Sequence, residues 1–132
     1  MPLSRISVPW LLSAAKARAL ADAVHHGLVT TCDVPDKNRF QLVSRYPSGS
    51  MLLDPTFPNV SRSAEACVIE ILLLEGRTPE QKSRLFQTIA ARAVDAGFCK
   101  DDIMIALAEN APTDWSLAGG LAFGRDHRAA RP

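Results

Sequence analysis

The sequence lacks several features that would tie it to a particular compartment or partner. It has no long apolar segment, so we expect neither a signal peptide nor a membrane span, and we predict a cytoplasmic protein without a membrane partner. Its three cysteines are an odd number without CxxC spacing, which fits a reducing compartment. Its 15 basic and 14 acidic residues nearly cancel, so we expect a small ligand and no nucleic acid partner.

Motifs for metals and phosphates are also missing. His25 and His26 stand beside no third ligand at a suitable spacing, and His127 lies close to the end of the sequence. Gly119-Gly120 is a turn signal rather than a nucleotide-binding loop. We therefore expect no metal site and no cofactor.

Apolar periodicity predicts four strands and two helices in this chain. The strands are expected at residues 3–8, 39–46, 67–74 and 103–109, and the helices at residues 13–31 and 78–97. The run at 67–74 is almost continuously apolar, which is typical of a strand in the middle of a sheet. Val94 belongs to the expected buried stripe of the second helix. Residues 47–63 are rich in proline and serine, so we expect a long loop with room for a small hairpin at 51–53.

This order of elements predicts an α/β (α+β) fold with a duplicated β-α-β unit. The two repeats span about 2–46 and 66–109 within a single domain at 1–124, and 125–132 is expected to be a flexible basic tail. The predicted sheet is four-stranded and mixed, with both helices on one face. Because its other face is left bare with apolar residues on it, we expect the chain to associate with copies of itself.

The first candidate for chemistry is Pro2. A small second residue permits removal of Met1, which leaves a secondary amine at the start of a strand. An α-amino group titrates near neutral pH, and burial or nearby cations lower its pKa further, so an enclosed Pro2 could act as a general base. Two residues specify little, and a chance proline after methionine is the simpler interpretation of this pair alone.

Longer motifs elsewhere in the chain favour a functional role for Pro2 over a chance proline. They are MPL at 1–3, VP at 34–35, RFQ at 39–41, RS at 62–63, GRTPEQK at 76–82 and ENAPTDWS at 109–116. In order and spacing, these motifs resemble the tautomerase superfamily, and specifically its branch that includes malonate semialdehyde decarboxylase. The resemblance covers nearly the whole chain. It implies a tautomerase fold of duplicated β-α-β units, assembled as a homotrimer with Pro2 in a pocket at the subunit interface.

The resemblance also implies roles for individual residues. Arg77 would hold the carboxylate of a small substrate and keep Pro2 deprotonated, although a solvated arginine near a helix start is the alternative. Trp115 would form part of the substrate-binding pocket wall, with a role in core packing nearly as well supported. Phe123 resembles the aromatic residue that closes the pocket, whereas Leu117 replaces a phenylalanine of the family pattern.

Two departures concern charge near Pro2. Asn38 stands where the decarboxylase branch has an acid; it can orient a water or a substrate oxygen but cannot take a proton, and we do not expect Asp36 to replace that acid. Glu75 stands where the branch has a second arginine. Glu75 is a candidate for the substrate-binding pocket: if it faces that pocket it would repel a carboxylate and raise the pKa of Pro2, whereas loss of the acid at position 38 would lower it.

Three hypotheses follow from these residues. The first is a cofactor-independent tautomerase, with Pro2, Arg77 and Asn38 as catalytic residues acting on a small 2-oxo or 2-hydroxy-dienoic acid. The second is a decarboxylase or hydratase of a 3-oxo, haloacrylic or acetylenic acid, with cationic Pro2 as the acid. The third is a non-catalytic trimeric scaffold or binding protein, since the charged groups around the proline are depleted.

Overall fold

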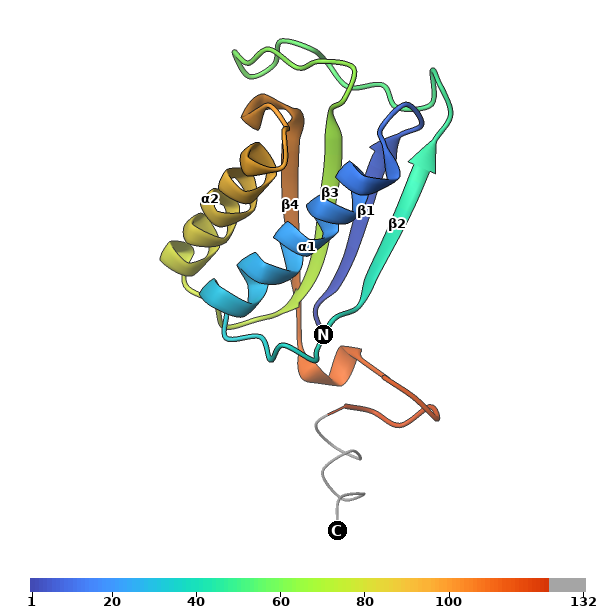
Figure 1. Ribbon diagram of the computed structural model, residues 1–132. Coiled ribbons are helices and arrows are strands. Elements are labelled where there is room, and N and C mark those ends of the chain that lie inside the picture. The colour runs from blue at the N-terminus through green and yellow to red at the C-terminus, as the bar shows by residue number, and fades with distance from the viewer. Residues whose placement is uncertain (124–132) are drawn as a thin grey trace.

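The computed structural model describes residues 1–123, so the expected tail at 125–132 lies outside the described residues. Within them, the elements follow the predicted order (Figure 1). The strands are β1 (Leu3–Pro9), β2 (Gln41–Tyr46), β3 (Cys67–Leu74) and β4 (Ile103–Asn110); the helices are α1 (Ala14–Thr31) and α2 (Pro79–Asp95), with short 3₁₀ helices η1 (Lys100–Asp102) and η2 (Pro112–Asp114). Every predicted strand and helix is confirmed, and the second strand begins two residues later than expected.

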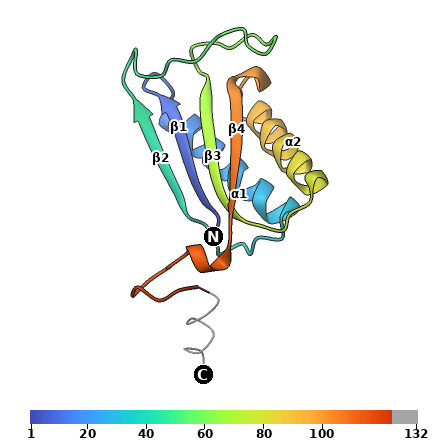
Figure 2. The ribbon, with the colours of Figure 1, turned by 180° about the vertical axis from the view of Figure 1, so that it is seen from behind.

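The strands form one mixed sheet in the order β2-β1-β3-β4. β1 is parallel to β2 and β3 is parallel to β4, while β1 and β3 run antiparallel at the centre. Each parallel pair is joined through a helix, and both helices cover the same face (Figures 1 and 2). The predicted duplicated β-α-β fold, with β3 inside the sheet, is therefore confirmed.

Side-chain chemistry explains where each helix starts and how the two helices meet. Ser13 caps α1 by accepting the Lys16 N–H, and Thr78 forms a capping box with Gln81 at the start of α2. Between the helices, Gly27 of α1 faces Ile89 of α2 so closely that a β-carbon there would lie 2.9 Å from the Ile89 side chain. A glycine at this position lets the helices pack together over the sheet.

Apolar side chains from the sheet and both helices form one core between the two layers. Its largest fully buried members include Ile6, Leu20, Leu28, Ile69, Ile71, Leu85 and Ile89. Val94 is not among them: it is 46% exposed, because it lies about 100° around the helix from the stripe of Leu85, Ile89 and Ala93, and its assignment to the buried stripe was wrong. The loop between β2 and β3 contains no strand at residues 51–53, so the small hairpin is also absent.

The face of the sheet opposite the helices is uncovered (Figure 2). Leu42, Leu72 and Met104 point to this side and are between 38% and 48% exposed. Arg5 and Glu70 sit directly opposite each other in the register of β1 and β3 on the same face. The expectation of a bare, partly apolar sheet face is confirmed.

Candidate active site

The topology brings four sequence-distant segments to one end of the sheet, which we call the Pro2 end. β1 and β2 begin there, and β3 and β4 finish there, as shown by the pairings of Leu3 with Leu72 and of Leu74 with Asn110. The N-terminus lies at this end, next to the chain that leads into β2 (Figure 1). Pro2 precedes β1, Asn38 lies shortly before β2, and Arg77 follows β3, so this end carries all three residues predicted to be catalytic.

Pro2 is buried at the start of β1, and its nitrogen is joined to Met1 in this structure. Asn38 holds the terminus with two hydrogen bonds. The Met1 amino group donates to Asn38 Oδ1 at 2.7 Å, and Asn38 Nδ2 donates to the Met1 carbonyl oxygen at 2.7 Å. Burial lowers the pKa of the Met1 amino group below its ordinary value, because the charged form loses solvation. An amine at this place is thus both hydrogen-bonded and partly desolvated.

Arg77 is half-buried and bound to backbone carbonyls of two elements. Its Nε and Nη2 donate to the Cys32 carbonyl oxygen at 3.2 and 2.8 Å, and its Nη1 donates to the Leu74 carbonyl oxygen at 3.2 Å. Cys32 is the C-cap of α1, so the cation lies at the negative end of that helix dipole. Arg77 therefore has a structural role that was not predicted, and it is not the solvated arginine of the alternative interpretation.

Trp115 is half-buried just beyond η2. Its indole Nε1 donates to Asn110 Oδ1 at 2.7 Å, and its carbonyl oxygen accepts the Phe123 N–H at 2.8 Å. The second bond belongs to a turn-back closed by a bridge between Ser116 and Ala122. Trp115 and Phe123 are therefore held together beyond the end of β4, and Trp115 does not belong to the buried core between the helices and the sheet.

Neither acidic neighbour replaces Asn38 at the amino terminus. The Asp36 side chain is 90% exposed, and its carboxylate lies 3.4 Å from His25 Nε2. Glu75 is exposed, and its backbone N–H donates to the Asn110 carbonyl oxygen at 2.9 Å. The structure brings Asn38 to Met1 and leaves Asp36 outside that contact.

Sequence reasoning missed the part played by Asn110. Its side chain accepts from Trp115 and its backbone accepts from Glu75, so one residue ties the segment after β4 to the segment after β3. Close by, Lys82 of α2 forms an ion pair with Glu109, and that hydrogen bond lowers the pKa of the Glu109 carboxyl. Asn110 lies within the ENAPTDWS motif, which marked the segment but not the hydrogen bonds.

Neither a metal-binding cluster nor a membrane-spanning helix is found among the described residues. Residues 1–123 contain no group of three or more His, Cys, Asp or Glu side chains placed to hold a metal ion. Among the same residues, neither helix is both long enough and apolar enough to span a membrane.

The fold and the enclosed terminus define a small duplicated β-α-β protein, and comparison with known proteins identifies its family. A family model described as tautomerase enzyme matches residues 38–118. Probable tautomerase YusQ of Bacillus subtilis (strain 168) is 32% identical over 123 residues, which cover 92% of this chain and 97% of that protein. The chain therefore belongs to the tautomerase superfamily of enzymes.

Solved structures agree with this assignment. FG41 malonate semialdehyde decarboxylase inhibited by 3-bromopropiolate is 33% identical, with a TM-score of 0.89 over 98% of this chain and 99% of that chain. A second malonate semialdehyde decarboxylase is 30% identical, with a TM-score of 0.83 over 91% and 93%. A fused 4-OT symmetric trimer is 21% identical with a TM-score of 0.75 over 98% and 99%, which shows the shared fold alone. The resemblance to the malonate semialdehyde decarboxylase branch is confirmed.

Proposed function

We propose that this protein is a cofactor-independent tautomerase whose general base is the amine of Pro2 after removal of Met1. The substrate would be a small 2-oxo or 2-hydroxy-dienoic carboxylic acid. In the enol-to-keto direction, Pro2 takes the proton of the enol hydroxyl, and the protonated proline returns it to a carbon of the conjugated system; the reverse direction starts with the proton on the carbon next to the carbonyl. Atoms and electrons therefore balance without a co-reactant. Arg77 holds the carboxylate and stabilises the enolate charge.

The observation that carries this proposal is the enclosed amino terminus. Asn38 contacts both the amine and the carbonyl oxygen of Met1. The Met1 carbonyl carbon is bonded to the Pro2 nitrogen, so Asn38 also lies close to that nitrogen. Burial already lowers the pKa of the amine here. The same burial would lower the pKa of a Pro2 amine and so favour its neutral form, which is the state that a general base needs.

The hydrogen bonds of Arg77 are compatible with substrate binding. A guanidinium carries five N–H groups, and three of them serve Cys32 and Leu74. One N–H on each terminal nitrogen is left for a carboxylate. Because its other donors fix the guanidinium against backbone carbonyls, Arg77 would meet the substrate in a prearranged position.

A second candidate function is decarboxylation of a 3-oxo acid or hydration of an unsaturated acid. It is favoured by the identity to the two malonate semialdehyde decarboxylases. In that case Pro2 would remain cationic as the acid, and Asn38 would orient a water or a substrate oxygen. An amine pKa well above neutrality would distinguish this function from that of a base.

We also propose that the active protein is a homotrimer. The bare face of the sheet exposes Leu42, Leu72 and Met104, which a second copy would cover. The symmetric trimer of the fused 4-OT relative is consistent with this assembly. Light scattering on the purified protein should give three times the mass of one chain, and a monomer would contradict this part of the proposal.

The test begins with the intact mass of the purified protein, which reports whether Met1 is removed. Turnover of phenylenolpyruvate to its keto form is then measured for the wild type and for Pro2→Ala. Alanine also permits methionine removal, so this variant replaces the secondary amine of proline by a primary amine without the ring. We expect kcat/KM to fall by about 10² to 10⁴-fold, the range for loss of a general base. NMR titration of the Pro2 nitrogen should give a pKa near or below neutrality.

Either of two results would overturn the tautomerase proposal. One is a native protein that retains Met1, because the Pro2 nitrogen is then an amide without a basic lone pair. The other is Pro2→Ala with wild-type turnover. If phenylenolpyruvate is not converted but a 3-oxo acid is decarboxylated by a cationic Pro2, the second candidate function is the correct one.

A further inference from the structure

The duplicated fold gives the sheet two related ends. Because β1 and β3 are antiparallel neighbours, a local two-fold axis between them exchanges the first β-α-β unit with the second. The helix caps fix the correspondence: Ser13 follows the last residue of β1 by four positions, and Thr78 follows the last residue of β3 by four. We call the end opposite Pro2 the distal end.

Corresponding positions at the two ends differ in chemistry. The residue before the helix cap is Arg77 at the Pro2 end and Leu12 at the distal end. Three positions before the cap, the pair is Glu75 and Trp10. At these two positions, a charged side chain of the Pro2 end is thus replaced by an apolar one. Leu12 is fully buried, whereas Trp10 is 68% exposed.

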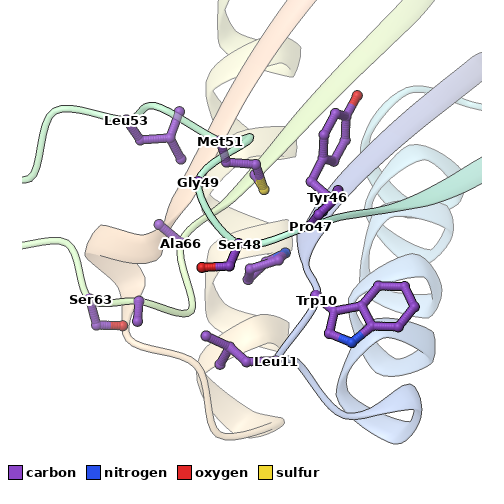
Figure 3. Close-up of a pocket in the computed structure, with 12 residues that line it drawn as sticks. Trp10, Leu11, Tyr46, Pro47, Ser48, Gly49, Met51, Leu53, Ser63 and Ala66 are labelled. Carbon is purple, nitrogen blue, oxygen red and sulfur yellow. The ribbon is translucent and has the colours of Figure 1, made fainter.

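The distal end has a cavity of its own, of about 400 Å³. Its walls come from the ends of β1 and β2 and from the loop between β2 and β3 (Figure 3). Trp10, Tyr46, Met51 and Leu53 supply much of the apolar lining, and Ser48 supplies a hydroxyl. The twelve described residues that line it include no charged side chain. Its size and its largely apolar lining are typical of small-molecule sites.

Hydrogen bonds hold the loop wall in place. Asp102 is buried, and its carboxylate accepts the Ser63 N–H at 2.7 Å and the Ser63 hydroxyl at 2.6 Å. Arg62 donates to the carbonyl oxygens of Asp54 and Phe57 across the loop. By the same correspondence, Asp102 is the counterpart of Asn38. Asn38 lies eight residues before Tyr46, where β2 ends, and Asp102 lies eight residues before Asn110, where β4 ends. The position that holds the amino terminus at one end holds the loop at the other.

We propose that the distal cavity binds a small neutral aromatic molecule, at a site separate from the Pro2 end. The rings of Trp10 and Tyr46 offer stacking surfaces, and the Ser48 hydroxyl offers one hydrogen bond. An anion would lose solvation here without meeting a charged side chain in the lining, and the nearby Arg45 guanidinium already donates to the carbonyl oxygens of Trp10 and Leu12. The two ends therefore select for opposite properties, a carboxylate at Pro2 and a neutral ring at the distal cavity.

The test is titration of the ¹⁵N-labelled full chain with 2-naphthol and, as its matched anion, 2-naphthoate. We expect 2-naphthol to shift the amides of Ser48, Gly49, Ala64 and Ala66, and to bind about tenfold or more tightly than 2-naphthoate at these residues. Pro2→Ala should show the same distal shifts. The result is therefore independent of whether the tautomerase proposal holds.

Three variants sharpen the measurement. Ala64→Trp places a bulky ring at an exposed position of the cavity lining and should abolish the 2-naphthol shifts, and Trp10→Ala should weaken binding about tenfold. Val94→Ala, on the exposed side of α2, is the control and should bind like the wild type.

Each of three outcomes would overturn the distal site. They are equal binding of 2-naphthol and 2-naphthoate, shifts confined to the Pro2 end, and a smaller oligomer for Trp10→Ala in light scattering. The last outcome would show that a second copy of the chain, and not a ligand, covers Trp10.

Discussion

The two ends of the sheet are built from the same β-α-β unit but present different chemistry. At the Pro2 end, Asn38 contacts an amine and Arg77 carries a positive charge. At the distal end, the counterpart of Pro2 is Cys67, since each lies seven residues before the end of its strand. Burial raises the pKa of the Cys67 thiol to about 12, so this position holds a neutral group in mid-chain. The two repeats thus place different groups at the same position, a buried neutral thiol at the distal end and Pro2 at the other end.

The largest effect is expected when Arg77 is replaced by leucine, the residue at the corresponding distal position 12. Arg77→Leu removes the cation, so kcat/KM on phenylenolpyruvate should fall about 100-fold, equivalent to about 2.7 kcal/mol. The carbonyls of Cys32 and Leu74 also lose their donors, which should lower the free energy of unfolding in urea by about 1–3 kcal/mol. Arg92→Leu, on the exposed part of α2, is the matched control. Loss of stability with wild-type kcat/KM would leave Arg77 a purely structural residue.

A smaller effect, confined to stability, is expected at the distal end. Asp102→Ala leaves the Ser63 N–H and hydroxyl without their acceptor, so the free energy of unfolding should fall by about 2 kcal/mol. Asp101→Ala is the control, because Asp101 accepts a single N–H, from Ser61, in a more exposed place. Turnover at the Pro2 end should stay within about twofold of the wild type, since distant sites act independently. A large loss of kcat/KM in a folded Asp102→Ala protein would show that the ends are coupled.

The smallest effect is a shift in the pH dependence of kcat/KM. It is expected when Asn38 is replaced by aspartate, the residue type of its distal counterpart Asp102. In Asn38→Asp, a negative charge near the Pro2 amine favours the protonated form and should raise its pKa by about one unit. The Pro2 amine is then deprotonated only at higher pH, so the acidic limb of the pH profile of kcat/KM moves up by about one pH unit. At pH values below this limb, kcat/KM of the variant falls about tenfold relative to the wild type. Asp36→Asn should not move this limb, because Asp36 lies against His25. An unchanged limb in Asn38→Asp would mean that position 38 does not face the amine.

Much of the fold was predictable because its signals are local. The alternation in β1 and β2, the apolar run of β3 and the capping box at Thr78 each involve residues within a few positions of one another. Val94 was misassigned because it is apolar and follows the buried Ala93, although one residue of helix turns its side chain out of the buried stripe. The loop at 51–53 was ambiguous because three apolar residues are too few to distinguish a strand from a loop.

The residues of the candidate site were found from motifs, but their contacts were not. Arg77 and Cys32 are 45 positions apart, and Asn38 and Met1 are 37 apart, so each hydrogen bond depends on how helices and strands pack. The distal cavity likewise forms only where the ends of β1 and β2 meet the loop between β2 and β3. The sequence by itself determined the order of elements, the duplicated unit and the identity of the candidate residues, since these follow from short-range patterns. Only the tertiary structure decided which side chains meet and which residues line the distal cavity, because those depend on long-range packing.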